Sequence, residues 1–454
     1  MKKKSVFKFS TTHLIMLSFI VAILIGSILL ALPISSATGK AVPYVDALFT
    51  ATTATCVTGL VTLPTVSSWS LFGHIVILIL IQIGGLGIIT IMTGIMIMFQ
   101  KKMGLGDRIL IQDAFNLNTL SGLVKFVKNV ILGTFLVEGI GAVLYMFVFV
   151  PKYGLKGIWI SVFNSISAFC NAGIDIIAED SLAGYATNPL VNFVTCTLII
   201  VSGIGYIVWW DILRVMKDKT HRRYRKFKNL TLHSKIAITT TLVLVFGGAL
   251  LIFIFEYNNP LTMKDFSLFE KIQASIFQSV TTRTAGFFTV PQENLSNASS
   301  IVSLLLMFIG GSPVGTAGGV KTVTITVLIA SAIASIKNRN EVILFHRTLA
   351  KPAVIKAIAV VVTSFAIMFT STILLSAVTP NASALDIVYE AVSATATVGL
   401  SKNLTSSLNT IGKIIIIATM YLGRIGPISL AIAFKTRKVN EYIITNPTED
   451  ISVG

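Results

Sequence analysis

Hydrophobic residues occur in long continuous runs along this chain, and the runs come in pairs separated by shorter segments of mixed character. A helix needs about 20 apolar residues to cross a hydrocarbon core of about 30 Å. The pattern predicts eight such helices, at 12–32, 72–99, 130–150, 190–213, 236–255, 301–336, 353–378 and 410–434. The chain is therefore predicted to be an all-α membrane protein with eight transmembrane helices.

A shorter segment lies between the two members of each pair and ends in Thr, Ser, Ala and Gly residues. These segments are 43–60, 156–174, 267–287 and 384–400. Each is too short to span a membrane but suits a half-helix that enters the bilayer and returns as extended chain. Irregular backbone at that depth is tolerated only where it lines a water-filled path or is buried in protein.

The ends of these segments reveal an internal repeat. Each segment has a glycine near its end, and successive glycines are 114, 113 and 113 residues apart: Gly59, Gly173, Gly286 and Gly399. An aromatic residue precedes each glycine by ten residues, or by nine in the third case: Phe49, Phe163, Phe277 and Tyr389. A second glycine follows by 24 to 30 residues: Gly84, Gly203, Gly310 and Gly423. Equal spacing across a whole chain is the signature of a repeat architecture.

The repeat defines the predicted organisation of the chain. Each unit contains a first helix, a short pore helix with its loop, and a second helix, and four such units surround a central pseudo-fourfold pore. The predicted units are 1–100, 101–216, 217–336 and 337–434, followed by a C-terminal tail at 435–454. The apolar run near the N-terminus resembles a signal peptide, but its place in the first unit predicts a retained helix.

Composition and charge support a membrane protein and predict its orientation. Of the 454 residues, 54% are hydrophobic and 12% are charged, and Lys+Arg outnumber Asp+Glu by 36 to 19. On the predicted cytoplasmic side, the tails and connecting segments carry 25 Lys and Arg residues, whereas the opposite segments carry eight. The positive-inside rule therefore places both termini in the cytoplasm and all four loops outside. It also accounts for the basic balance without a nucleic acid partner. The basic segment 214–235 is either a docking surface for lipid headgroups or a partner, or an ordinary solvated loop.

Candidate chemistry is sparse, which excludes several classes of function. The three cysteines and five histidines show no metal-ligand or redox spacing, and no paired acid or nucleophile–base arrangement indicates an enzyme. The loops share no carboxylate, so an ion site there must use backbone carbonyls. Glycine permits positive φ, which lets a strand point successive carbonyls at one axis, and four such strands replace the hydration shell of a cation. The preceding half-helices would aim their partly negative C-termini at that cation.

With these loops and the repeated unit, the chain resembles the Trk/Ktr/HKT potassium transporter superfamily over essentially its whole length. It looks most like the Ktr membrane subunit of the KtrB/KtrD type, because only a short basic tail precedes the first repeat. The resemblance implies that the four glycines belong to a potassium selectivity filter. The implied filter residues are Val57, Thr58, Gly59, Leu60, Asn171, Ala172, Gly173, Ile174, Thr284, Ala285, Gly286, Phe287, Thr397, Val398, Gly399 and Leu400.

A glycine-rich stretch interrupts the sixth hydrophobic run at 310–322. Five glycines and a proline there weaken a helix by about 1 to 3 kcal/mol each, so the chain must unwind within the membrane. The resemblance implies that this stretch is the loop that gates the pore, whereas a passive kink is the alternative. The implied gate residues are Gly310, Gly311, Ser312, Gly315, Thr316, Gly318, Gly319, Lys321 and Arg424. An arginine within a membrane segment is costly and usually functional, and Arg424 is predicted to donate hydrogen bonds to carbonyls of this loop. Arg283 is expected toward the outer face of the third loop, where it either braces the loop through hydrogen bonds or is solvated.

The predicted function is potassium uptake across the plasma membrane. The resemblance further implies a homodimer in lipid and a cytoplasmic nucleotide-binding regulatory ring of the KtrA/KtrC type. No cofactor is expected, potassium is the substrate, and sodium is a candidate activator. The competing interpretation is a secondary cation carrier. Its inverted repeats would alternate in sidedness, whereas here all four loops fall on the side with few positive charges.

Overall fold

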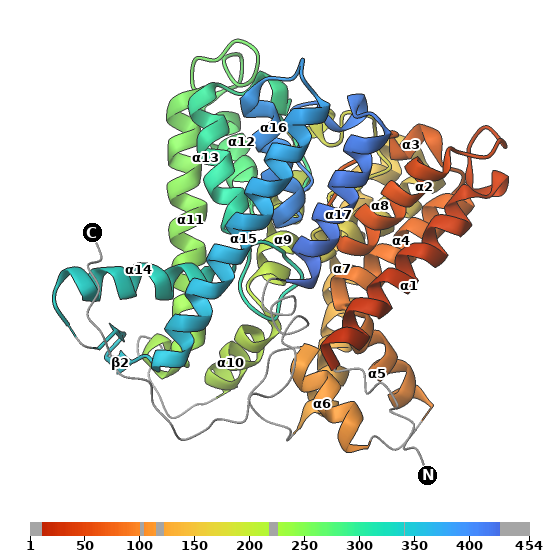
Figure 1. The fold of residues 1–454 in the computed structure, drawn as a ribbon. Helices are drawn as coiled ribbons and strands as arrows, with labels where there is room; N and C mark the ends of the chain where they lie inside the picture. The colour runs from red at the N-terminus through yellow and green to blue at the C-terminus, as the bar shows by residue number, and fades with distance from the viewer. Residues whose placement is uncertain (1–10, 100–103, 115–121, 218–225, 340, 427–454) are drawn as a thin grey trace.

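The computed structural model describes residues 11–99, 104–114, 122–217, 226–339 and 341–426, and it is built almost wholly of helices (Figure 1). A two-stranded antiparallel hairpin, β1 Ile343–Leu344 and β2 Arg347–Thr348, precedes the helix α15. The predicted tail at 435–454 lies outside the described residues. So do residues 1–10 and 218–225, which carry much of the basic charge of the N-terminus and of the segment 214–235.

Each predicted repeat opens with a long apolar helix. These helices are α1 Thr11–Ala31, α7 Leu123–Tyr153, α11 Leu232–Glu256 and α15 Lys351–Val378. All four are long and apolar enough to cross a membrane, and the greater part of each apolar window is not buried within the chain. Large hydrophobic side chains therefore face outward, as expected for contact with lipid.

A shorter helix follows each long one and points its C-terminus toward the centre of the molecule. These pore helices are α2 Tyr44–Cys56, α8 Leu155–Cys170, α12 Leu268–Thr281 and α16 Ala384–Ala396. Polar caps fix two of their starts: Ser267 forms a capping box with Glu270, and the Ser383 side chain accepts a hydrogen bond from the backbone N–H of Asp386. The aromatic residue that marked each repeat in the sequence is fully buried here: Phe49, Phe163, Phe277 and Tyr389.

A third helix in each repeat follows the loop and begins the second predicted crossing. These helices are α4 Leu71–Leu86, α9 Pro189–Gly203, α13 Asn297–Phe308 and α17 Thr410–Ile425. Each starts at a residue whose side chain accepts a hydrogen bond from a backbone N–H of the first turn: Ser70, Asn188, Ser296 and Asn409. The same cap in all four repeats supports their common origin as one structural unit.

The second crossing is bent in the first and second repeats, and the prediction of continuous helices at 72–99 and 190–213 was wrong. The chain bends by 96° between α4 and α5 Ile88–Met98, and by 94° between α9 and α10 Tyr206–Lys217. Gly87 and Gly205 lie at these bends with φ of 82° and 93°, a conformation that ends a helix. Residues on both sides of each bend are apolar, so the hydrophobic pattern did not reveal it.

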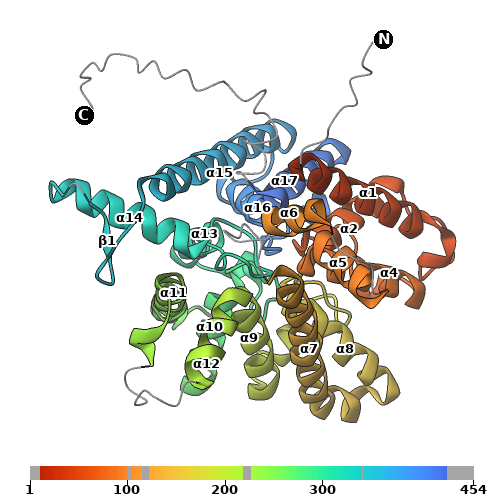
Figure 2. The same ribbon diagram turned by 90° about the horizontal axis from the view of Figure 1, so that it is seen from below.

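The third and fourth repeats differ from the first two. In the third, α13 ends at Phe308 and α14 Thr322–Ile336 begins after the glycine-rich stretch, as predicted, and α14 projects away from the bundle (Figures 1 and 2). In the fourth, α17 ends at Ile425, before Gly426 with φ of 85°. The rest of the predicted run to residue 434 lies outside the described residues. The first half also contains two short α-helices, α3 Thr65–Ser68 and α6 Leu105–Ala114.

The repeats follow one another around a common centre, as Figure 2 shows from below. Each third helix packs against the pore helix of the next repeat: α4 against α8, α9 against α12, α13 against α16, and α17 against α2. The last pairing joins the fourth repeat to the first and closes the ring. This arrangement confirms the predicted class, an all-α membrane protein of four repeats around a pseudo-fourfold axis.

Candidate ion pathway

The four loop glycines lie together at the centre of the ring. A Cβ placed on Gly59 would lie 3.2 Å from the Cα of Gly399 and 3.3 Å from the Cα of Gly173. One placed on Gly286 would lie 3.0 Å from the Cα of Gly173 and 3.4 Å from that of Gly399. Each glycine therefore neighbours the glycine of the preceding and the following repeat. Residues 113 or 114 apart in the sequence form one closed ring.

Carbonyl groups occupy the space that side chains would need. The Cβ of an alanine at Gly59 would lie 2.6 Å from the carbonyl oxygen of Ala172, and one at Gly399 would lie 2.3 Å from that of Thr58. Distances this short exclude a Cβ at these positions. The carbonyl of the residue before each glycine therefore lies against the glycine of a neighbouring repeat. Such a close set of carbonyl groups is what coordination of a cation by backbone oxygens requires.

Backbone conformation explains why the loops turn here. Two residues before each glycine, the chain takes up the left-handed conformation: Val57, Asn171, Thr284 and Thr397 have φ between 52° and 69°. The glycines themselves have φ between 63° and 97°. Two residues of positive φ, separated by one residue, end each pore helix and start the extended return. All sixteen predicted filter residues lie in these four turns, and nearly all of them are buried.

Hydroxyl groups near the C-terminal ends of the pore helices form hydrogen bonds with the backbone of the loops, and the sequence prediction did not include them. The backbone N–H of Gly59 donates to Thr53 Oγ1 at 2.9 Å, and that of Gly399 donates to Ser393 Oγ at 3.1 Å. Ser167 Oγ donates to the carbonyl of Ile174, and Thr281 Oγ1 to that of Phe287. The signal was present in the sequence, because a Ser or Thr precedes each glycine by five or six residues.

The third loop is one residue shorter on its helix side. Thr58, Ala172 and Val398 each donate their backbone N–H to the residue five positions earlier, whereas Ala285 donates to Thr281, four positions earlier. This difference explains why Phe277 precedes its glycine by nine residues instead of ten.

The glycine-rich stretch lies against the lower side of the ring. The backbone N–H of Ser312 donates to the Gly203 carbonyl at 2.8 Å, and that of Gly318 donates to Thr284 Oγ1 at 3.0 Å. A Cβ on Gly318 would lie 2.0 Å from Thr397 Oγ1, so only glycine fits beneath the fourth loop. We call residues 310–321 the intramembrane loop.

The central glycines and hydroxyl residues of the intramembrane loop are buried. They are Gly310, Gly311, Ser312, Thr316 and Gly318, whereas Gly315, Gly319 and Lys321 are partly buried. The loop therefore fills the space directly below the ring.

Cationic side chains donate hydrogen bonds to carbonyls of the intramembrane loop. Arg424, near the end of α17, donates to the carbonyl of Thr316 at 2.8 Å and to the carbonyl of Gly84 at 2.6 Å. The ammonium group of Lys321 donates to the carbonyls of Ala317 and Gly318 within its own loop. Hydrogen bonds from charged donors are stronger than neutral ones. The loop is thus tied to both the first and the fourth repeats through Arg424.

Arg283 does not lie toward the outer face as expected. Its side chain is only 6% exposed, and its guanidinium donates to the carbonyl of Gly310 at 3.1 Å. The position of Arg283 in the sequence, three residues before Gly286, did not indicate this direction. The cause is the unwound chain after α13, whose free carbonyls offer the acceptors that a buried guanidinium needs.

Oxygen atoms near the ring remain available to a cation. Thr58 Oγ1, Asn171 Oδ1 and Thr397 Oγ1 are buried and have no hydrogen-bond partner among the described residues. Buried acceptors without a partner are costly and need an explanation, of which an ion or water on the axis is one. Within the same described part of the chain, no cluster of His, Cys, Asp or Glu could hold a metal ion.

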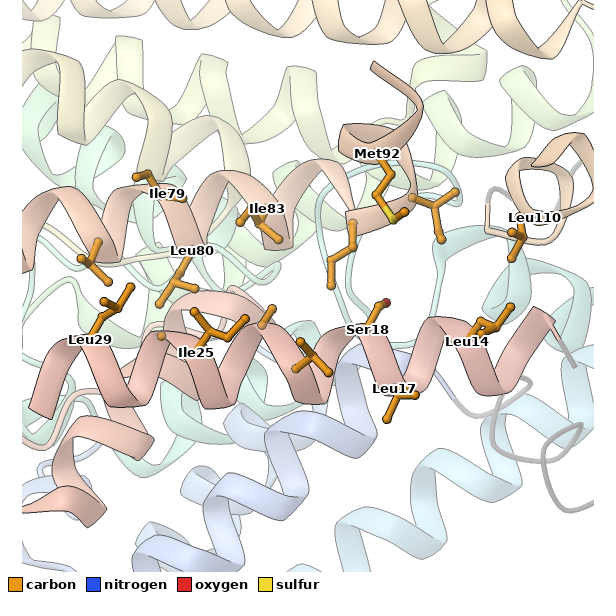
Figure 3. Close-up of a pocket in the computed structure, with 16 residues that line it drawn as sticks. Leu14, Leu17, Ser18, Ile25, Leu29, Ile79, Leu80, Ile83, Met92 and Leu110 are labelled. Atoms are coloured by element: carbon orange, nitrogen blue, oxygen red, sulfur yellow. The ribbon is translucent and has the colours of Figure 1, made fainter. Parts of the chain in front are cut away.

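A large cavity lies elsewhere and is unsuited to ions. It measures about 610 Å³ and lies between α1, α4, α5 and Leu110 of α6 (Figure 3). Its lining is apolar except for Ser18, as the side chains in Figure 3 illustrate with Leu14, Ile25 and Met92. A dehydrated cation would find almost no oxygen there, so this cavity is a poor candidate for an ion pathway.

Comparison with known proteins agrees with this geometry. The sequence profile of the TrkH family, described as cation transport proteins, matches residues 3–442. The chain belongs to the TrkH family. Its relatives include the Ktr system potassium uptake protein B of Bacillus subtilis, which is 41% identical over 98% of this chain and 97% of the relative. The potassium/sodium uptake protein NtpJ of Enterococcus hirae is 38% identical over 100% of this chain and 99% of the relative.

A solved structure shares the fold. The potassium transporter TrkH from Vibrio parahaemolyticus superposes with a TM-score of 0.75, covering 96% of this chain and 87% of that one, at 16% sequence identity. Membership of a transport family also confirms that this chain is not an enzyme, as the lack of a catalytic constellation predicted.

Proposed function

We propose that this chain is the ion-translocating membrane subunit of a Ktr-type system that takes up potassium across the plasma membrane. The observation that carries the proposal is the closed ring of Gly59, Gly173, Gly286 and Gly399, with a carbonyl directed along it from each repeat. Relatives named as potassium uptake proteins match nearly the whole chain, which supports the same substrate here.

Potassium loses water as it enters the ring. The carbonyls of Thr58, Ala172, Ala285 and Val398 replace part of its hydration shell, and the C-terminal ends of the pore helices stabilise its charge. No carboxylate is needed, because many weak oxygen dipoles bind the ion loosely enough to release it. No cofactor takes part in this step, and sodium acts as an activator or a competing ion.

The intramembrane loop is the gate. It fills the space below the ring, and Arg424 holds it in place by hydrogen bonds to Thr316 and Gly84. Ions pass when these bonds break and the loop moves aside. A cationic guanidinium beside the pathway also lowers the occupancy of potassium while the loop is closed.

The system has further components. The relatives' description as parts of a Ktr system supports a cytoplasmic nucleotide-binding regulatory ring of the KtrA/KtrC type, and the membrane subunit acts as a homodimer in lipid. The excess of Lys and Arg in the segments predicted to be cytoplasmic supports a cytoplasmic location of both termini, on the side where the regulatory ring binds.

Uptake of rubidium or potassium into liposomes containing the purified chain tests this function. We expect uptake that external potassium inhibits more than sodium does, and that Gly286→Asp abolishes. A matched control is Gly184→Asp, because Gly184 is exposed, lies outside the ring and has no heavy atom near its Cβ position. Equal uptake by Gly286→Asp would contradict the filter.

The competing secondary carrier gives a different outcome in the same assay. A carrier would couple potassium uptake to a sodium or proton gradient, so dissipating that gradient would stop net uptake. A conducting pore continues to take up potassium down its own gradient.

A further inference from the structure

In the part of the chain that the structure describes, the intramembrane loop forms hydrogen bonds with the second and third filter loops, and in each of them one bond involves the same position of the repeat. That position is the left-handed residue two before each glycine. In the second loop it is Asn171, whose Nδ2 donates to Thr316 Oγ1 at 3.0 Å. In the third loop it is Thr284, whose Oγ1 accepts the backbone N–H of Gly318 at 3.0 Å. In the first loop it is Val57, which has no polar group to offer.

Further bonds join the same parts. Thr316 Oγ1 donates to the carbonyl of Phe169 at 3.0 Å, just before Asn171. Arg283, next to Thr284, donates to the carbonyl of Gly310. The second and third filter loops therefore each contact the intramembrane loop through two hydrogen bonds. All of the side chains involved are at most 6% exposed, so water does not compete for these bonds.

The fourth loop meets the intramembrane loop by packing instead. Gly318 lies so close to Thr397 that a Cβ would be 2.0 Å from its Oγ1 and 2.6 Å from the carbonyl of Ala396, and Thr397 Oγ1 is among the unpartnered oxygens described above. Such packing resists approach but does not resist separation. Hydrogen bonds resist separation. Among the four filter loops, withdrawal of the intramembrane loop therefore breaks hydrogen bonds to the second and the third, in addition to the separate bond from Arg424 to Thr316.

We propose that Asn171 and Thr284 are positioning residues that couple the gate to the filter. With the intramembrane loop in place, they fix the backbone of the second and third filter loops in the left-handed conformation. When the intramembrane loop moves aside, the second and third filter loops lose these hydrogen bonds, whereas the first and fourth have no such bond to lose. The ion selectivity of the filter then depends on the state of the gate. This inference rests on the proposed function.

A valine at position 284 tests the coupling with little change in shape. Thr284→Val removes the acceptor for Gly318 while keeping the side-chain volume, and Val57 shows that valine is compatible with this conformation in the first loop. We expect basal rubidium uptake in liposomes to rise and the preference for potassium over sodium to fall, each by about fivefold, as the loss of one buried hydrogen bond would give. Thr284→Ser keeps the hydroxyl and should restore both quantities.

Thr241→Val is the matched control. Thr241 is a buried threonine of α11, outside the ring and the intramembrane loop, and its hydroxyl has no partner in the described part of the chain. Both quantities should stay at the wild-type level. Asn171→Gly is the second variant, because glycine takes up the left-handed conformation without strain while losing the bond to Thr316. It should shift selectivity in the same direction.

The outcomes separate the coupling from the function itself. A changed uptake rate with an unchanged potassium-to-sodium preference, in both Thr284→Val and Asn171→Gly, would overturn the coupling and leave the proposed function standing. No selective uptake by the wild-type chain would overturn the proposed function. If Thr284→Val does not fold, Asn171→Gly alone decides between the two.

Discussion

The upper and lower halves of the membrane region differ in how strictly they keep the repeat. At the level of the ring, four loops share a left-handed residue, a glycine of positive φ and a supporting hydroxyl. Below the ring, the second crossing bends at Gly87 in the first repeat and at Gly205 in the second, unwinds over 310–321 in the third, and ends at Ile425 in the fourth. Symmetry is kept where an ion is held by several equal groups, and lost where a single movable element controls passage.

The distribution of charge follows the same division. The ring contains no charged residue among its sixteen filter positions. The intramembrane loop contacts Arg283, Lys321 and Arg424, each of which donates hydrogen bonds to backbone carbonyls. The upper half thus offers oxygens to a cation, whereas the lower half surrounds its loop with positive charge. The following predictions test this contrast, beginning with the lower half.

The largest effect is expected when the intramembrane loop loses its tether. Arg424→Gln removes two charge-assisted hydrogen bonds, which contribute about 1.5 to 3 kcal/mol each when buried. We expect basal potassium uptake by the chain alone to rise about tenfold or more, measured in liposomes without any regulatory protein. Lys351→Gln is a suitable control, because Lys351 is exposed at the start of α15. Uptake that stays level or falls in Arg424→Gln would argue against a gating role.

A smaller effect is expected when one supporting hydroxyl is removed from the ring. Thr53→Val leaves the backbone N–H of Gly59 without its acceptor at the same side-chain volume. The loss of one buried hydrogen bond changes an equilibrium constant by about fivefold. We expect the rate of potassium uptake at saturating potassium to fall by that factor. The neighbouring Thr52→Val is the control, since Thr52 Oγ1 bonds only within its own helix, to the carbonyl of Leu48. Similar losses in both variants would show that the helix, and not the ring, responds.

The smallest effect is expected at the seam between the fourth and first repeats. Lys413 of α17 forms an ion pair with Asp46 of α2, with an N–O distance of 2.5 Å and side chains 17% and 10% exposed. Removing one member of a partly buried pair leaves the other uncompensated. Lys413→Met should lower the thermal unfolding midpoint of the purified protein by about 2–5 °C with little change in uptake. The double variant with Asp46→Asn should recover part of the loss, whereas an additive loss would mean that the pair does not stabilise the seam.

Much of the fold could be predicted because it depends on features that a sequence displays directly. The spacing of Gly59, Gly173, Gly286 and Gly399 predicted the four repeats, and the density of glycine at 310–322 predicted the break in the third. The bends at Gly87 and Gly205 could not be predicted in the same way. A single glycine within an apolar run is common in membrane helices, and its φ depends on tertiary contacts.

The site was partly predictable for a related reason. The filter residues follow from the register of the repeats, and the donation from Arg424 to a loop carbonyl matches what the cost of a buried arginine suggested. The direction of Arg283 depends on where free carbonyls lie in space, which the sequence does not display. The supporting hydroxyls were within reach, since Thr53, Ser167 and Ser393 each precede their glycine by six residues.

The central claim is that the four loops hold a dehydrated potassium ion on one axis. Crystals of the protein grown with rubidium in place of potassium would test it most directly through anomalous scattering. The account predicts a peak on the axis of the ring, within coordination distance of the carbonyls of Thr58, Ala172, Ala285 and Val398. A ring without a peak, while rubidium binds at another place along the chain, would contradict it.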